Sequence, residues 1–291
     1  MKKALVTGGA GFIGHHLVNL LLSKNYQVEV WDNLSVGKIE RIPNGVEFKK
    51  LDLTYDIFPE DNFDVVFHLA APTSVQESLE NPNKYEQGCY MATKRLLDWS
   101  VTHGVKGFMM ASTSAIYGNP EEIPLKETSP INPMSPYAEG KLRAEQLMKS
   151  YRDRYDIDCT ALRLFNVYGE GQHDSGSYAP AVALFMKQFE AFNPITVTGD
   201  GLQTRDYVYV GDVVRAFVMA SEKPSPIFRM MNVGTGDEIS IKEIAESFGG
   251  EIIYVEPRIE PKRSVADTYK IKKELGWQYN QSLLAWIEDN K

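Results

Sequence analysis

The sequence predicts a doubly wound α/β fold, in which helices cover both faces of a parallel sheet, with a smaller C-terminal lobe. Short apolar runs alternate with helical patterns through the first 165 residues. Glycine-rich or polar segments follow the ends of these runs, and after residue 165 the pattern becomes irregular. Such βαβ alternation places ligands at the carboxyl ends of parallel strands.

The first element pair is a predicted strand at residues 3–6 and a predicted helix at residues 12–23, joined by a glycine-rich turn. The joining stretch, residues 7–14, reads TGGAGFIG. Glycines let a turn close tightly and let backbone N–H groups approach a pyrophosphate at the positive end of a helix. The predicted cofactor contacts in this stretch are Gly8, Gly11, Phe12, Ile13 and Gly14.

The second predicted strand, residues 27–31, ends on Asp32, which lies 18 residues after Gly14. A carboxylate at this place accepts hydrogen bonds from the adenosine ribose hydroxyls and repels the extra phosphate of NADP. The order of strand, glycine turn, helix and acid therefore predicts a Rossmann-type unit that binds NAD. The alternative is a glycine-rich turn without a ligand.

Further elements follow in the same alternation. Strands are predicted at residues 63–69, 107–112 and 159–164, and helices near 84–103 and 136–155. We expect an NAD-binding domain at 1–165, with a return segment at about 206–222, and a substrate lobe at 166–205 and 223–291.

Composition excludes several function classes. The chain has 291 residues, a net charge of −8, 43% hydrophobic residues and 24% charged residues, as in ordinary globular proteins. An acidic chain argues against a nucleic-acid surface, and no apolar run is long enough for a membrane span. A strand that begins at residue 3 leaves no room for a signal peptide. Cys89 and Cys159 have neither metal-ligand nor disulfide spacing, so we expect buried thiols, no metal and a cytoplasmic protein.

The candidate catalytic pair is Tyr137 and Lys141, which lie one turn apart on one face of a helix. A tyrosine has a pKa of about 10, too high for a base near neutral pH. We expect the neighbouring cation and the positive nicotinamide to lower that pKa. Thr113, in the hydroxyl cluster that ends an upstream strand, could share a substrate proton with Tyr137. A YxxxK pair alone would instead indicate an ordinary surface helix.

These motifs together resemble the nucleotide-sugar epimerase/dehydratase family of extended short-chain dehydrogenases/reductases. The resemblance runs through residues 7–14, 32–33, 52–53, 68–71, 112–118, 137–141, 163–169, 205–207 and 232–236. It implies further cofactor contacts from Asp32, Asn33, Asp52, Leu53, Leu69, Ala70, Ala71, Tyr137, Lys141 and Phe165. It implies substrate contacts from Thr113, Tyr137, Asn166, Arg205 and Arg258.

Two positions depart from the family pattern. Cys89 stands where the family usually has an asparagine, which changes the expected hydrogen bonding near Lys141. The family usually reads Arg-x-Gly-Asp/Glu near the C-terminus, but this chain has Arg258 followed by Ile-Glu-Pro. Arg263 or Lys262 could take the place of Arg258 at the substrate diphosphate.

The reaction is indicated by the two residues directly after Thr113. Similar 4,6-dehydratases have Asp-Glu there, and decarboxylating members have Glu at the second position, whereas this chain has Ser114 and Ala115. An epimerase needs neither carboxylate, because the keto intermediate rotates in the pocket and then accepts hydride on its other face. We therefore expect an NAD-dependent 4-epimerase, with UDP-glucose/UDP-galactose as the default substrates. A keto-sugar-nucleotide reductase and a non-catalytic NAD-sensing regulator are the alternatives.

We also expect a homodimer, because in similar enzymes the two helices near 84–103 and 136–155 form an isologous four-helix contact. Leu96, Leu97, Leu142 and Leu147 are the candidate apolar residues, some of which must pack inward as core.

Overall fold

The computed structural model of the chain describes residues 1–173, 180–257 and 261–291. These residues form two compact units. Unit 1 comprises Met1–Ile116, Pro133–Arg163 and Val214–Met231, and unit 2 comprises Tyr117–Asn132, Leu164–Val213 and Asn232–Lys291. The domain boundaries expected from the sequence stay a prediction.

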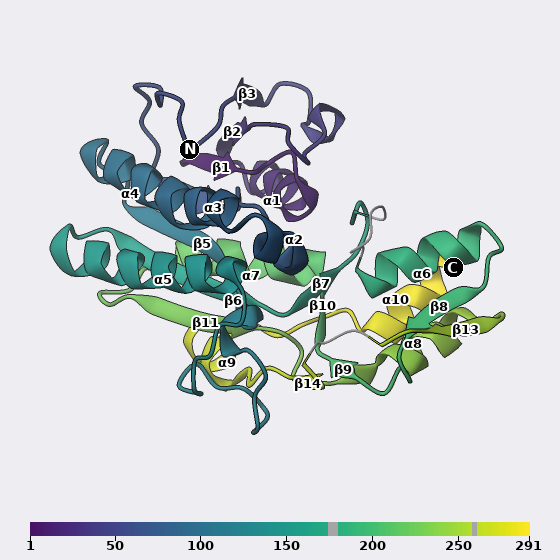
Figure 1. The fold of residues 1–291 in the computed structure, drawn as a ribbon. Helices are drawn as coiled ribbons and strands as arrows, with labels where there is room; N and C mark the ends of the chain where they lie inside the picture. Colours follow the sequence, from purple (N-terminus) through teal and green to yellow (C-terminus); the bar gives the residue numbers. More distant parts are fainter. Residues whose placement is uncertain (174–179, 258–260) are drawn as a thin grey trace. The chain divides into compact units, whose positions relative to one another are not determined.

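A seven-stranded parallel sheet is the framework of unit 1, in the order β11-β6-β5-β4-β1-β2-β3 (Figure 1). The predicted alternation is confirmed, since the first six strands in sequence lie in this sheet. Their bounds are β1 Lys3–Thr7, β2 Gln27–Asp32, β3 Glu47–Lys50, β4 Val65–His68, β5 Gly107–Thr113 and β6 Asp158–Leu164, and β11 is Arg229–Val233.

Helices cover both faces of this sheet, so the expected doubly wound arrangement is confirmed. On one face α4 (Ala92–Thr102) and α5 (Pro136–Arg154) lie side by side (Figure 1). On the other face Phe67 of β4 packs edge-on against Phe217 of α7 (Val210–Glu222), with 6.5 Å between ring centroids. Helix α1 (Phe12–Ser23) contacts β1 and β2. Two short 3-10 helices follow β2 and β5: Ile39–Arg41 in unit 1, and Ser114–Tyr117, which ends on the first residue of unit 2.

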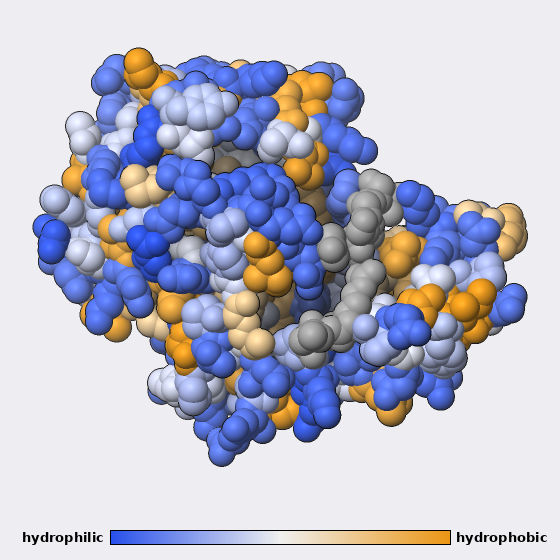
Figure 2. Space-filling model, in the orientation of Figure 1, coloured by the Kyte–Doolittle hydropathy of each residue, from blue (hydrophilic) through white to orange (hydrophobic). Residues whose placement is uncertain are grey.

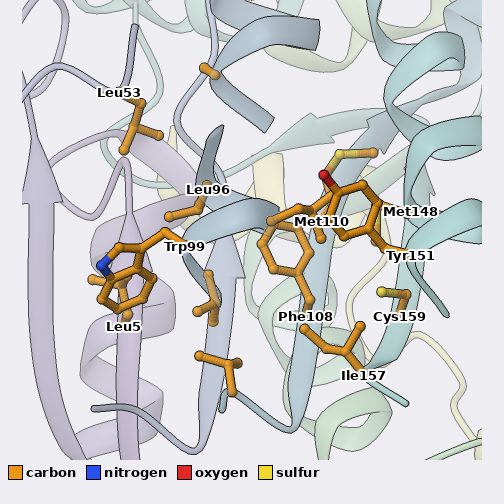
Figure 3. Packing of buried hydrophobic residues seen from close by; sticks show 14 of the residues in the cluster. Leu5, Leu53, Leu96, Trp99, Phe108, Met110, Met148, Tyr151, Ile157 and Cys159 are labelled. Atoms are coloured by element: carbon orange, nitrogen blue, oxygen red, sulfur yellow. The ribbon is translucent and has the colours of Figure 1, made fainter. Parts of the chain in front are cut away.

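The main core fills the space between the sheet and the helices α4 and α5 (Figure 3). Alternate strand residues point into it, as the period of a half-covered strand face requires. At its edge Trp31 and Trp99 meet with ring centroids 5.1 Å apart. The buried residues shown include Leu5, Leu96, Phe108, Met110, Met148 and Cys159.

The segment before α4 departs from the single helix predicted near 84–103. It consists of α2 (Val75–Glu80), α3 (Pro82–Tyr85), one π-helical turn (Glu86–Met91) and then α4. A π-turn inserts an extra residue into the helical repeat, and such turns occur at functional sites. Here the turn carries Cys89, which is fully buried.

The described residues of unit 2 form a core of their own and three small sheets. Parallel pairs form between β7 (Asn166–Tyr168) and β10 (Tyr207–Tyr209), and between β8 (Ile195–Thr198) and β13 (Ile252–Val255). The third sheet has the order β12-β9-β14, with bounds Ile239–Ser240, Thr204–Arg205 and Arg263–Ser264. The helices are α6 (Ala181–Glu190), α8 (Ile241–Phe248), α9 (Tyr269–Leu275) and α10 (Leu283–Asn290).

Hydrophilic residues dominate the face drawn in Figure 2, with smaller hydrophobic patches between them. Leu96 and Leu97 are fully buried core residues, so they are not available to an interface, and Leu142 and Leu147 are half-buried. Cys89 and Cys159 are buried thiols, as expected. Within the part of the chain that the structure describes, no helix is long and apolar enough to cross a membrane.

Candidate active site

The glycine-rich turn between β1 and α1 depends on two glycines. Gly8 has a φ of +72°, which disfavours other residues, and its N–H donates to the carbonyl of Trp31 at 2.8 Å. A Cβ at Gly14 would lie 2.1 Å from the carbonyl oxygen of Gly8, closer than any side chain tolerates. The turn therefore brings the first residues of α1 against the ends of two strands.

The N-terminus of α1 suits an anion. Its N-cap is Gly11, which makes no side-chain cap, and its first turn carries no acidic residue. Backbone N–H groups and the helix dipole attract negative charge at such an end. Together with the glycine cradle, these features fit the pyrophosphate of a dinucleotide at the residues predicted to hold it, including Phe12 and Ile13.

Asp32, at the end of β2, is tied to this turn. Its Oδ2 accepts a hydrogen bond from the N–H of Ala10 at 3.0 Å, and its Oδ1 accepts one from Leu34 at 2.8 Å. Burial raises the pKa of Asp32, while these backbone bonds oppose the rise. A carboxylate has about four acceptor positions, so Asp32 can bind ribose hydroxyls and still order the turn.

The residues predicted to contact the adenine are hydrogen-bonded to one another. Asn33 donates to Asp52 at 2.7 Å, and the N–H of Thr54 donates to the same carboxylate at 2.8 Å. Burial alone would raise the pKa of Asp52, but the bonds from Thr54 and Asn33 lower it. The next residue, Leu53, is buried, and its carbonyl accepts from Arg95 of α4. No sequence motif marks Arg95.

After β4 the loop at residues 69–71 is held against the end of β1. Leu69 donates its N–H to the carbonyl of Thr7 at 3.1 Å, and Ala70 donates to the hydroxyl of Thr7 at 3.4 Å. Ala71 then packs against a small buried cluster of Tyr85, Cys89 and Tyr137. The structure therefore brings the predicted loop 69–71 to the predicted catalytic tyrosine.

Tyr137 lies in the first turn of α5, the helix that carries both candidate catalytic residues. Pro136 stands at the first position of α5, and the hydroxyl of Ser135 caps the helix by accepting from the N–H of Ala138 at 3.2 Å. Tyr137 is only 9% exposed and is hydrogen-bonded to Thr113. The ring of Tyr85 meets it edge-on, with centroids 6.2 Å apart.

The expected lowering of the tyrosine pKa does not come from the protein chain. Burial raises the pKa of Tyr137, and the hydrogen bond with Thr113 offsets only part of the rise. Lys141 instead donates to the carbonyl of Ala111 at 2.9 Å, and burial lowers its pKa. The protein therefore favours the neutral phenol of Tyr137. Only the positive nicotinamide remains as an expected cause of a lower Tyr137 pKa.

Cys89 lies among these groups. Gly140 has no side chain, and a Cβ there would stand 3.0 Å from the Cβ of Cys89. The thiol contacts the carbonyl of Pro72 at 3.7 Å, and burial raises its pKa. The residue is thus a neutral, buried thiol at the contact between the π-turn and α5.

A buried ion pair connects α5 to the central sheet. No sequence motif marks this pair. The Nη2 of Arg163 lies 2.7 Å from Oε2 of Glu145, and its Nε donates to Oε1 at 3.0 Å. Ser112 donates to the same carboxylate at 2.5 Å. Glu145 lies one turn after Lys141, so the pair fixes the helix beside the candidate catalytic residues.

The predicted substrate residues after residue 163 lie in unit 2. The side chain of Asn166 donates to the carbonyl of Asp206 at 3.1 Å, and Phe165 is buried. Arg205, on β9, donates to the carbonyl of Thr204 at 2.8 Å. Arg258 lies outside the described residues.

Arg263 is a poor replacement for Arg258. In the parallel pairing of β14 with β9, Arg263 stands opposite Thr204 and Ser264 stands opposite Arg205. Side chains alternate along strands, so Arg263 and Arg205 point to opposite faces. Arg263 is also paired with Glu238. The structure therefore does not favour Arg263 beside Arg205 at one diphosphate, and the choice of the second cation stays a prediction.

Comparisons with known proteins identify the family of the chain. A family model described as NAD dependent epimerase/dehydratase family matches residues 4–234. A UDP-glucose 4-epimerase from Mycolicibacterium smegmatis is 37% identical over an alignment of 302 positions, which covers 98% of this chain and 96% of the relative.

Two solved structures are similar over 99% of this chain. One is a UDP-N-acetylglucosamine 4-epimerase from Methanobrevibacter ruminantium, in complex with UDP-N-acetylmuramic acid, with a TM-score of 0.93, 31% identity and 96% of that chain covered. The other is a UDP-glucose 4-epimerase from Thermus thermophilus in complex with NAD, with a TM-score of 0.89, 34% identity and 97% covered.

Proposed function

The chain belongs to the NAD dependent epimerase/dehydratase family, and on this premise we propose that it is a nucleotide-sugar 4-epimerase of the UDP-glucose/UDP-galactose type. The observation that carries the choice of reaction lies beside Tyr137. The partly buried Ala115 packs against the Tyr85, Cys89 and Tyr137 cluster. Decarboxylating members of the resembling family have a glutamate at this position, and a methyl group cannot act as an acid or base.

The cofactor is held by the N-terminal half of unit 1. Gly8, Gly11 and Gly14 form the cradle at the pyrophosphate, and Asp32 accepts the ribose hydroxyls. Lys141 has three N–H donors, one of which bonds Ala111, so the ammonium can also bind the second ribose. Bound NAD supplies a hydride acceptor at the sugar carbon and a donor on return.

The chain's own residues move the proton. Tyr137 takes the proton of the sugar C4 hydroxyl as that carbon is oxidised, and Thr113 holds the same oxygen through its hydroxyl. Tyr137 then returns the proton after the keto sugar has rotated in the site. This cycle ends with the starting protonation state, so no further carboxylate is needed.

Asn166 and Arg205 are the proposed substrate contacts in unit 2, with Phe165 at the nicotinamide. Arg205 supplies positive charge for the substrate diphosphate, which an acidic chain must provide locally. We also place Asn33, Asp52 and Leu53 at the adenine. The protein acts as a homodimer in the cytoplasm, where its two buried thiols stay reduced.

The test is to mix purified protein with UDP-glucose and no added cofactor, and to analyse the products. An epimerase that retains NAD forms UDP-galactose. A reductase turns over only with external reduced cofactor and a keto-sugar nucleotide, and a sensor does nothing. Release of carbon dioxide from UDP-glucuronate would instead identify a decarboxylase and overturn the argument from Ala115.

The same assay identifies the substrate. UDP, dTDP, GDP and CDP sugars are compared, and UDP-N-acetylglucosamine is included because one similar structure is an epimerase of that sugar. The Tyr137→Phe variant is the matched control for contaminating epimerase.

A further inference from the structure

His68 is a buried titratable group of unit 1 to which the proposed mechanism gives no role. His68, the last residue of β4, is 1% exposed. Its Nδ1 lies 2.8 Å from the hydroxyl of Thr7, at the end of β1, and its Nε2 lies 2.9 Å from the hydroxyl of Thr93, on α4. The ring therefore joins the sheet to a helix that covers it.

The direction of these hydrogen bonds follows from donor and acceptor counting. The hydroxyl of Thr93 lies 2.6 Å from the carbonyl of Cys89, which can only accept. Because Thr93 has one proton and gives it to Cys89, it must accept from Nε2–H of His68. A neutral ring with its proton on Nε2 has a lone pair on Nδ1, so Thr7 donates there.

The chain of bonds then continues to the loop after β4. The hydroxyl of Thr7, having donated to His68, accepts from the N–H of Ala70 at 3.4 Å. The order is Ala70 to Thr7 to His68 to Thr93 to the carbonyl of Cys89. Burial and the charge of Lys141 lower the pKa of His68 to about 3, so the ring stays neutral near pH 7.

We propose that His68 is a positioning residue for the cofactor site, which as a neutral Nε2–H imidazole fixes the loop at Ala70 and the π-turn at Cys89 in one arrangement. Both ends of the chain of bonds touch the site: Ala70 is a proposed cofactor contact, and Cys89 packs against Tyr137. This role rests on the proposed function, because it concerns NAD binding. It predicts that losing the ring weakens NAD binding.

The first test reads the ring itself and needs no activity. Full-length protein with ¹⁵N-labelled histidine is examined by NMR, and the His68 signal is assigned by its loss in His68→Gln. We expect the Nε2–H tautomer and no titration between about pH 5 and about pH 8. A ring that titrates in this range, or carries its proton on Nδ1, would overturn the proposal.

A second variant tests the direction of the bonds. Thr93→Val removes the acceptor of Nε2–H, so the His68 proton should move to Nδ1, where Thr7 can accept it. Thr102→Val is the matched control: Thr102 also donates to the carbonyl four residues earlier, at 2.9 Å, but is exposed and far along α4 from the ring. An unchanged tautomer in Thr93→Val would contradict the assigned order.

The functional readout is the Kd for NAD, measured by titration without sugar. His68→Phe keeps the ring volume but loses both bonds, and we expect its Kd to rise by about tenfold or more. His103→Phe, a change on a mostly buried ring stacked on Trp99 and outside the proposed cofactor contacts, should leave the Kd unchanged. Equal NAD affinity of wild type and His68→Phe would refute the positioning role.

Failure of this role and failure of the proposed function give different results. If the wild type binds no NAD, the proposed function is wrong, while the tautomer still tests the bonding order. If His68→Phe does not fold, Thr93→Val replaces it in the NAD titration, where a Kd equal to that of Thr102→Val would refute the role.

Discussion

At the scale of single residues, the proton chemistry depends on one buried hydroxyl. Tyr137→Phe removes that oxygen and keeps the ring against Tyr85, so the fold should be unaffected. We expect turnover to fall by roughly 10²–10⁴-fold, with NAD still bound. Product assays and an NAD titration on the same sample check this, with Tyr155→Phe as control, an exposed tyrosine just after the same helix. Near-wild-type turnover would remove Tyr137 from the mechanism.

The pH profile tests Lys141. Because a base must lose its proton to act, activity should rise with pH up to the working pKa of Tyr137. Burial raises that pKa, and the positive nicotinamide, not Lys141, is the expected source of lowering. In Lys141→Met the residual activity is therefore expected to keep the pH profile of the wild type, with a higher Kd for NAD because a proposed ribose contact is lost. A profile shifted to higher pH would show that Lys141 also lowers the pKa of Tyr137.

Asp32 has two functions that a variant can separate. Asp32→Ala removes the charge and also the bonds to Ala10 and Leu34, whereas Asp32→Asn keeps an acceptor oxygen for the turn. We expect wild-type protein to bind NAD in preference to NADP, and Asp32→Asn to narrow the preference by about tenfold. Competitive titration of the two cofactors measures the ratio. Equal affinities of the wild-type protein for NAD and NADP would contradict the proposed role of the Asp32 charge.

At the scale of elements, the position of α5 depends on charges as well as apolar packing. Glu145→Gln leaves the buried guanidinium of Arg163 without a counter-charge. We expect the free energy of unfolding to fall by roughly 3–5 kcal/mol, measured by urea denaturation. Glu139→Gln, on the exposed side of the same helix, should change it by less than about 0.5 kcal/mol. Similar values for both variants would mean that the pair does not anchor the helix.

At the scale of the whole molecule, the dimer prediction survives in a changed form. With Leu96 and Leu97 in the core, the outward sides of α4 and α5 carry polar groups such as Lys94, Asp98 and Arg143. An isologous contact there would need paired charges as well as Leu142. We expect sedimentation to give about twice 32.8 kDa at low salt, and Arg143→Glu to weaken the assembly. A monomer mass for wild type at micromolar concentration would refute the dimer.

Much of this architecture could be predicted from the sequence because it follows from local sequence patterns. The glycine turn and the pair Tyr137 and Lys141 are short-range signals, and the sheet follows from alternation. Burial is not local: the raised pKa of Tyr137 and the neutral His68 depend on packing by residues far away in sequence. The π-turn at Cys89 was missed because one inserted residue leaves the apolar periodicity of a helix almost intact.

The paired indoles of Trp31 and Trp99 can serve as an intrinsic spectroscopic probe. Two chromophores held 5.1 Å apart at 66° couple their transitions, which should appear as a distinct near-ultraviolet circular dichroism band. The other two tryptophans, Trp277 and Trp286, both belong to unit 2, where Trp286 donates to Glu170 at 2.7 Å. The band therefore reports on unit 1 alone, so its loss on heating can be timed against fluorescence from all four indoles to show whether the two units melt together.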